Sequence, residues 1–421
     1  MAALEAKVSG SLVQSSPRIF YGWFVVAGTF AVTFVGFGCA YTFSAFLPSL
    51  QQDFAASRGS ISLVFSLAGF LYFALGMVSG PLSDRFGPRR LAVAGMLLTG
   101  LGLALASAAR SLGEVYAAYG LGVGLGVGAS YVPVLGAVQQ WFVRQRGLAS
   151  GVGVAGIGVG TLVMPPAAAA LIETLGWRDA YLVLGIFAAV VGGGLALLIE
   201  NDPRDRGLSP DGDPLQPGAQ GRAPAAASLR EALRSRPFLG LCAACVIGAF
   251  GVFVPFVHLV PYALDHGVAQ SAAVFLLGAI GVGSTAGRFF LGGLADRLGR
   301  AFSLLIMVVG MAFAFVVWVL ATSFWPLAAF ALLFGLFYGG WVALMPAVVA
   351  DYFPGRNIGT VLGVLSLSIA FGTLIGPSAA GFAYDFSRSY TVPILASAAS
   401  YVVAAAILAF TSRAVAPADG R

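Results

Sequence analysis

Long apolar stretches alternate with short polar segments along almost the whole chain. Each stretch holds about 20 mainly apolar residues, the length at which a helix crosses the hydrocarbon core of a bilayer. The first begins at Phe20 without a small-residue cleavage site, so we predict a retained helix and not a signal peptide. The pattern predicts an all-α membrane protein with twelve transmembrane helices, centred near Thr33, Phe70, Leu98, Gly124, Val159, Ala188, Gly248, Gly281, Val308, Leu333, Leu367 and Ala399.

One polar segment is much longer than the others and divides the helices into two sets of six. It runs from Asn201 to Pro237 and is rich in proline, glycine, aspartate and arginine, a composition typical of a linker. The predicted organisation is a tail over residues 1–19, a six-helix bundle over 20–200, a cytoplasmic linker over 201–237, a second six-helix bundle over 238–412 and a tail over 413–421.

Composition and charge agree with this topology. The 421 residues are 59% hydrophobic and 10% charged, whereas a soluble domain carries about 25% charged residues. If both termini are cytoplasmic, the 23 lysines and arginines lie in inner loops and tails except for four in outer loops and one within a helix, namely Arg58, Arg110, Arg178, Arg388 and Arg288. The positive-inside rule therefore predicts a multi-pass protein of the cell inner membrane with both termini in the cytoplasm. The net charge of +6 reflects topology and does not indicate a nucleic-acid partner.

A charged loop motif occurs once in each half of the chain. It reads G-P-L-S-D-R-F-G-P-R-R over residues 80–90 and G-G-L-A-D-R-L-G-R over residues 292–300. We expect the first glycine to let helices approach, the aspartate to accept from a helix N-terminus or a basic side chain, the second glycine to turn the chain, and the arginines to anchor at the lipid surface. Internal duplication is typical of a transporter with its substrate site between two related bundles. The motif residues are Gly80, Asp84, Arg85, Gly87 and Arg89, then Gly292, Asp296, Arg297, Gly299 and Arg300.

On these residues the chain resembles the major facilitator superfamily, whose G-x-x-x-D-R-x-G-R-R loop is present at both positions. The twelve helices, the central linker and the G-W-R sequence at residues 176–178 are also similar. The resemblance extends from Tyr21 to Arg413. It implies two pseudo-symmetric six-helix bundles that rock to give alternating access to a central site, in a carrier that functions as a monomer.

Arg288 is the charged residue placed most deeply in an apolar stretch, which runs from Ala272 to Leu294. An arginine at the bilayer centre costs about 2.5–3.5 kcal/mol on insertion scales. Its guanidinium offers a planar fork of donors that suits a carboxylate. We therefore predict an anion-binding site at Arg288. The alternative is a structural arginine bonded to helix-end carbonyls or to a fixed acid.

A second resemblance, to the monocarboxylate transporter family, indicates the substrate class. Residues 141–151 (W-F-V-R-Q-R-G-L-A-S-G), followed by Ala155, Gly156 and Gly160, resemble that family's signature between helices 4 and 5. Residues 21–23 (Y-G-W) are similar to its opening motif. The family's helix 8 carries an arginine that receives the substrate carboxylate, and Arg288 occupies that place.

The chain departs from that family in the charges around the site. The position one turn before the arginine is often aspartate in the family and is Ser284 here, and Tyr41 lies near the place of a lysine found in the animal members. A related bacterial group that exchanges oxalate for formate uses a second cation in helix 11, whereas residues 358–384 contain no lysine or arginine. A lone cation balances one negative charge, so we predict a monoanionic substrate.

Proton cotransport would make the movement of a monoanion electroneutral, and it requires a titratable group near the cavity. The seventh helix carries His258 and Asp265, two turns apart and therefore on a similar face. We predict that Asp265, helped by His258, pairs with Arg288 in the empty carrier and takes up a proton when a carboxylate displaces it. The alternatives are an exposed acid at the outer end of the helix and a structural histidine bonded to carbonyls that neighbouring prolines leave free.

The remaining lining of the site is predicted to be aromatic or small and polar. Tyr131 and Tyr338 lie near mid-membrane, where a phenol could reach a carboxylate or the 2-hydroxyl of lactate. Tyr41, Ser284 and Ser366 are further candidates.

These observations together predict a secondary active transporter, a proton-coupled symporter of short monocarboxylates such as L-lactate and pyruvate. The alternatives are an organic anion exchanger of the oxalate–formate type, a drug efflux carrier in which Arg288 is structural, and a sensor that binds a carboxylate without moving it. The predicted partners are a small organic monoanion, a proton and the lipid bilayer. The sequence has no phosphate-binding glycine loop, metal cluster or Ser/His/Asp constellation, so we predict no enzyme activity, no cofactor and no metal site.

Overall fold

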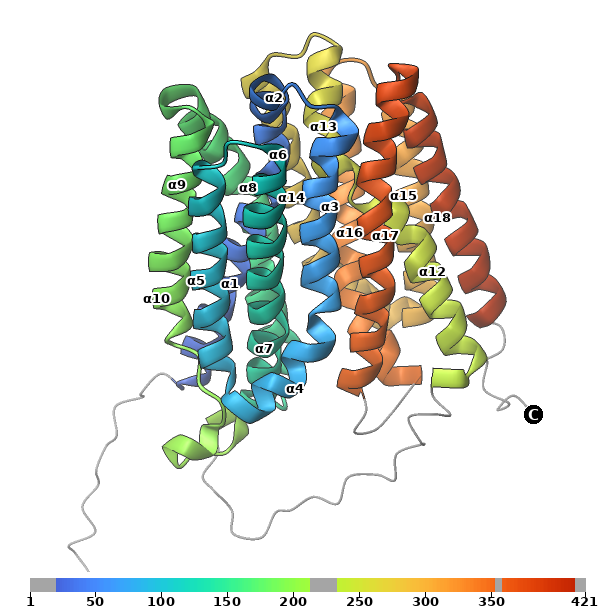
Figure 1. The fold of residues 1–421 in the computed structure, drawn as a ribbon. Coiled ribbons are helices and arrows are strands. Elements are labelled where there is room, and N and C mark those ends of the chain that lie inside the picture. Colours follow the sequence, from blue (N-terminus) through green and yellow to red (C-terminus); the bar gives the residue numbers. More distant parts are fainter. Residues whose placement is uncertain (1–19, 213–232, 353–357, 413–421) are drawn as a thin grey trace, which may run out of the picture.

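The computed structural model describes residues 20–212, 233–352 and 358–412. Within these residues, twelve helices or helix combinations are long and apolar enough to cross a membrane. Each of the twelve predicted centres falls in one of these spans, so the predicted helix pattern is confirmed. The helices stand side by side, with the blue and green first half next to the yellow and red second half (Figure 1).

The first half forms one bundle. Its first three spans consist of α1 (Gly22–Tyr41) with α2 (Phe43–Phe54), α3 (Arg58–Ala74) with α4 (Gly76–Phe86), and α5 (Pro88–Ser107). The next three consist of α6 (Leu112–Val115), η1 (Tyr116–Val123) and α7 (Gly124–Trp141), then α8 (Arg146–Leu175), then α9 (Trp177–Phe187), η2 (Ala188–Gly192) and α10 (Gly193–Ala196). Two short turns, η3 (Pro203–Arg206) and η4 (Pro210–Gly212), begin the linker.

The second half forms the other bundle. Its spans are α12 (Arg236–Val252) with α13 (Val254–Asp265), α14 (Gln270–Leu298), α15 (Arg300–Leu320), α16 (Phe324–Tyr352), α17 (Ile358–Ser387) and α18 (Thr391–Ser412). We call the end of the molecule where α1 begins and α18 ends the inner end, and the opposite end the outer end (Figure 1). The arginine bias predicts that the inner end is cytoplasmic.

The first helix of each bundle is interrupted at a similar place. In the first bundle the break is at Thr42, whose hydroxyl donates to the Cys39 carbonyl at 2.7 Å. In the second it is at Phe253, and Pro255 follows at the start of α13. Proline lacks an amide hydrogen and fits the first turn of a new helix. The matching breaks agree with two related bundles.

The duplicated loop places a glycine at the same turn in both bundles. Gly87 precedes α5 with φ of 84°, and Gly299 precedes α15 with φ of 89°. This part of backbone space favours glycine because a side chain would be strained there. The predicted sharp turns are therefore confirmed. The predicted role of Gly80 is not supported, because an added Cβ would make only ordinary contact with Val132 at 3.7 Å.

The two bundles meet along α3 with α17 and along α8 with α14. At the second contact the backbones approach closely, since a Cβ added to Gly281 would lie 2.6 Å from the Gly158 carbonyl. Small residues at such a crossing allow helices to pack tightly inside a membrane. This approach brings the middle of α14 against the opposite bundle.

Candidate functional site

Arg288 lies within α14, and its side chain is 7% exposed. Its Nη1 donates to the backbone carbonyl of Val154 at 2.7 Å. Because Val154 lies on α8, this hydrogen bond joins the two bundles. The Nε and Nη2 atoms are buried and have no hydrogen-bond partner among the described residues.

The unpartnered edge of Arg288 has the geometry of a carboxylate site. A buried donor without a partner costs about 1–3 kcal/mol, and more when it is charged. Nε and Nη2 present two parallel N–H groups, which can bind both oxygens of one carboxylate. The arrangement thus has one guanidinium edge fixed by the protein and one edge available to a ligand.

Three tyrosines surround the guanidinium. Tyr338, Tyr131 and Tyr41 all lie close enough to Arg288 to interact with it electrostatically, and Tyr41 lies beside Tyr338. They come from α16, α7 and α1, so both bundles contribute. The structure therefore brings together the arginine and all three tyrosines that were named from the sequence.

Aromatic rings pack around these tyrosines. The ring centroids of Phe37 and Tyr131 are 4.9 Å apart, those of Tyr41 and Phe256 are 4.5 Å apart, and those of Phe256 and Tyr338 are 5.7 Å apart. Phe37 lies on α1 before the break at Thr42, and Phe256 lies on α13 just after the break at Phe253. These rings exclude water, which strengthens electrostatic interactions with Arg288.

The two candidate serines differ in position. Ser284 lies one turn before Arg288 on α14, is 3% exposed, and its Oγ has no hydrogen-bond partner in the described part of the chain. Residues four apart share a helix face, so Ser284 and Arg288 lie on the same side of α14. Ser366 is half-buried on α17, and its role stays a prediction.

The predicted pairing of Asp265 with Arg288 is wrong. Both Asp265 oxygens accept instead from Arg58, at 2.6 and 2.7 Å. The reason is the distance along the helices. Asp265 ends α13 at the outer end, whereas Arg288 is 18 residues beyond the start of α14 at Gln270. That separation is about 27 Å of helix rise.

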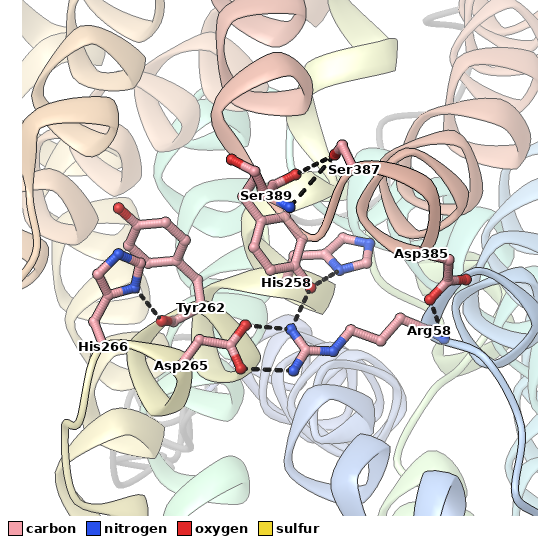
Figure 2. A network of polar contacts seen from close by, with 9 residues as sticks. Arg58, His258, Tyr262, Asp265, His266, Asp385, Ser387 and Ser389 are labelled. Carbon is pink, nitrogen blue, oxygen red and sulfur yellow. Dashed lines mark hydrogen bonds and ion pairs between the residues drawn. The ribbon is translucent and has the colours of Figure 1, made fainter.

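Arg58 is the centre of a polar network at the outer end, in which Figure 2 labels Arg58, Asp265, His258 and Asp385. Tyr390 joins Arg58 to His258, and we call these five residues the outer network. Arg58 also donates to the Tyr390 hydroxyl at 3.0 Å. The Asp385 oxygens accept from the amides of Arg58 and Gly59 at 3.1 and 2.8 Å. Since Arg58 begins α3 and the other members belong to the second bundle, this network joins the bundles at their outer ends.

His258 connects this network to the protein interior. Its side chain is fully buried, and its Nε2 lies 2.7 Å from the Pro377 carbonyl. A carbonyl only accepts, so Nε2 carries the hydrogen and Nδ1 of the neutral ring accepts from the Tyr390 hydroxyl at 3.0 Å. A chain of hydrogen bonds therefore runs from Arg58 through Tyr390 to His258. Both ring nitrogens of His258 have partners, as expected for the alternative of a structural histidine.

The duplicated motif is only partly described. Arg89 donates to the Ile199 carbonyl at 2.7 Å and to Glu200 at 2.9 Å, so its described partners are protein groups, and its predicted anchoring at the lipid surface stays a prediction. Arg85 is exposed. The predictions for Asp84, Gly292, Asp296 and Arg297 lie outside the described side chains, and Arg300 keeps its predicted role untested.

Several residues of the site were not named from the sequence. The sequence analysis assigns Arg58 to an outer loop as a topology signal and does not name Asp385, although the position of each beside an outer loop is compatible with a pair. Val154 contributes a backbone carbonyl, which no side-chain pattern reveals. Tyr390 lies in the loop between α17 and α18, where helical periodicity gives no sign of its neighbours.

Comparisons with known proteins decide the family. The family model of the Major Facilitator Superfamily matches residues 29–322 and 281–420. Monocarboxylate transporter 11 of Mus musculus is 32% identical, covering 88% of this chain and 84% of that protein. Monocarboxylate transporter 3 of Rattus norvegicus is 31% identical, covering 93% and 80%. The chain belongs to the monocarboxylate transporter family of the major facilitator superfamily.

A solved structure supports the fold of this family member. A bacterial homologue of the human lysosomal transporter Spinster, in an inward-facing and unoccupied conformation, matches with a TM-score of 0.72 at 18% identity. The match covers 93% of this chain and 97% of that structure. The chain is thus a multi-pass transporter and not an enzyme.

Loss of the Arg58–Asp265 ion pair should open the outer end of this transporter. The measurement uses a chain whose three cysteines are replaced by alanine and which carries Ser284→Cys as the reporter. A membrane-impermeant thiol reagent is added from the outer side. We expect Arg58→Gln to raise the labelling of this reporter severalfold. Arg178→Gln is the control, because Arg178 pairs with Asp53 at the same end but within one bundle. Equal labelling in Arg58→Gln and its parent would contradict a gating role.

Proposed function

We propose that this transporter carries short monocarboxylates such as L-lactate and pyruvate across the cell inner membrane together with a proton, by alternating access. The relatives are named monocarboxylate transporters, which supports the substrate class. The observation that carries the proposal is the buried Arg288, with one edge bonded to Val154 and the other available. The predicted topology places both termini in the cytoplasm. The resemblance to the major facilitator fold implies that a single copy of the chain is sufficient for transport.

The charge of the site favours a monoanion. The described ion pairs do not include Arg288, so its positive charge is left for the substrate to balance. One carboxylate would satisfy the Nε and Nη2 donors and neutralise the guanidinium at once. A dianion would keep one charge without a partner, which is costly in a buried site.

The Arg288–Val154 hydrogen bond offers a route from binding to movement. Arg288 is on α14 of the second bundle and Val154 on α8 of the first. A carboxylate that binds the guanidinium competes for its donors and reorients its fork, so occupation changes a bond between the two bundles. This is the differential contact that a ligand needs in order to shift a conformational equilibrium.

The proton is proposed to act at the outer network. Moving an anion alone against the membrane potential costs about 2.3 kcal/mol per charge for each 100 mV, and a cotransported proton removes this cost. Protonation of Asp265 would remove its ion pair with Arg58. Protonation of His258 would make Nδ1 a donor, so Tyr390 could no longer donate to it, and would place a second positive charge near Arg58. Either event weakens the contact that joins the outer ends.

The first test is uptake of labelled L-lactate into proteoliposomes under an inward proton gradient. We expect Arg288→Gln to reduce the initial rate by about 30-fold or more, since truncating one partner of a buried charged hydrogen bond costs about 2–5 kcal/mol. Arg110→Gln, an exposed arginine of an outer loop, is the matched control and should keep the rate of the parent.

Other outcomes of that test would decide against the proposal. Unchanged uptake in Arg288→Gln would make the arginine structural, as in a drug efflux carrier. A folded parent protein that fails to move lactate but performs oxalate–formate counterflow would instead favour the exchanger.

Ser284 is expected to recognise the 2-oxygen of the substrate. Its unpartnered hydroxyl shares a helix face with Arg288, so it can bond the 2-hydroxyl of lactate or the 2-oxo group of pyruvate. We expect Ser284→Ala to lower the ratio of lactate to propionate transport by about fivefold, the effect of one hydrogen bond worth about 1 kcal/mol.

The control for this measurement is Ser303→Ala, which removes another buried and unpartnered hydroxyl, on α15. An equal loss of lactate and propionate transport in Ser284→Ala, or no change in either, would show that Ser284 does not bind the 2-oxygen.

Proton coupling is tested by comparing net uptake with exchange. We expect Asp265→Asn or His258→Gln to abolish acceleration of lactate uptake by a proton gradient while lactate–lactate exchange continues, because exchange requires no net proton movement. The readout is the ratio of the two rates at pH 6 and pH 7.5 outside. If both variants keep the gradient dependence of the parent, the proton site lies elsewhere.

A further inference from the structure

A cleft of about 630 Å³ opens at the inner end of the first bundle. It lies between the α4–α5 turn and the start of the linker, away from Arg288. Four arginines line it, together with two acids, Glu200 and Asp205. The arginines are Arg85, Arg89, Arg90 and Arg206. The cleft therefore has an excess of positive charge among its described side chains.

Two of the four arginines are already engaged with Glu200. Arg206 bonds both Glu200 oxygens at 2.5 and 2.8 Å, and Arg89 donates to one of them at 2.9 Å. The hydrogen bond from Arg206 is the main cause that lowers the pKa of the Glu200 carboxyl, so this acid stays ionised at neutral pH and its charge is used within the protein. These contacts hold the linker start against the bundle.

Arg85 and Arg90 are the cations that remain available. Both are exposed, and neither takes part in an ion pair within the described part of the chain. The guanidinium of Arg85 lies 5.3 Å from the Phe86 ring centre. Their charges lie on either side of the α4–α5 turn and face the same cleft.

The start of α5 adds backbone donors to this cleft. Gly87 is its N-cap and has no side chain to accept from the first-turn amides, and Pro88 occupies the first helical position. The N-terminus of a 20-residue helix carries a partial positive charge, and its first-turn N–H groups have no carbonyl partner within the helix, which suits a phosphate oxygen. Arginines on both sides of such a terminus form a site for one phosphate.

The apolar surroundings favour a lipid over a free anion as the occupant of this cleft. Leu82 and Phe86 on α4 are 41% and 47% exposed, and Val78, one turn earlier, is 49% exposed. The cleft lies at the inner end of a membrane-spanning bundle, the depth at which lipid headgroups are expected, and the exposed apolar side chains follow one face of α4 from Val78 to Phe86 at its rim. A free anion would find the same cations but would leave the apolar side chains without a partner.

From these features we propose that the cleft binds the headgroup phosphate of an anionic phospholipid, with Arg85, Arg90 and the α5 N-terminus as donors. The acyl chains lie along Val78, Leu82 and Phe86. The linker start, held by Glu200, forms the wall opposite the helix terminus. This site is separate from the transport site and does not depend on which substrate is carried.

The test is thermal unfolding of the full chain in detergent during titration with short-chain phosphatidylglycerol. We expect saturable stabilisation of the parent protein, and an apparent affinity lower by at least about tenfold in Arg85→Gln/Arg90→Gln, since each arginine near an anionic lipid contributes about 1 kcal/mol. The matched control is Arg204→Gln/Arg236→Gln, which removes two exposed charges at the inner end that do not line the cleft.

Two further ligands separate the sources of the effect. Phosphatidylcholine of the same chain length should stabilise the protein much less, and glycerol phosphate at the same concentrations should give no saturable shift. Equal stabilisation by glycerol phosphate would show a site for a free anion, and equal stabilisation by phosphatidylcholine would show apolar binding alone. Either result, or an unchanged affinity in Arg85→Gln/Arg90→Gln, would overturn the proposal.

Discussion

A buried guanidinium with a single protein hydrogen bond sets the physical constraint on this fold. Removing a full charge from water costs several kcal/mol even after the protein relaxes. The Val154 carbonyl offsets part of this cost for Arg288 by accepting a hydrogen bond from Nη1. The carbonyl is within reach only because Gly158 and Gly281 let α8 and α14 approach. The tight packing between the bundles thus supports the electrostatics of the site, and the unpartnered edge of the guanidinium keeps the site receptive to an anion.

Two polar contacts join the bundles at different depths. Arg288–Val154 lies in the interior, and the ion pair of Arg58 with Asp265 lies at the outer end. Asp385 adds to the second contact by accepting from the first amides of α3. Rocking that separates the outer ends must break the second contact. Because the two contacts use different arginines, an anion can act on one and a proton on the other without sharing a partner.

The sequence was sufficient for most of the fold and for part of the site. Apolar stretches determine the twelve spans, and glycine at the duplicated turns is required by a positive φ at Gly87 and Gly299. The depth of Arg288 and the mid-membrane tyrosines also follow from position along helices. The partner of Asp265 did not follow, since helical periodicity gives a shared face but not a shared depth. Counting the rise along α14 would have excluded Arg288, but choosing Arg58 required knowing that α3 packs beside the second bundle.

The proposed separation of the anion site from the proton site has an electrostatic consequence. Because the residue one turn before Arg288 is Ser284, α14 supplies no counter-ion at that position. An empty site then keeps an uncompensated charge in a low dielectric, and this charge opposes occlusion of the empty carrier. A bound monocarboxylate removes that penalty by neutralising the guanidinium. In the proposed mechanism, the proton weakens the outer contact, and the anion neutralises Arg288 so that the site can close. Neither step alone permits the full movement of the bundles. Anion and proton transport are therefore coupled.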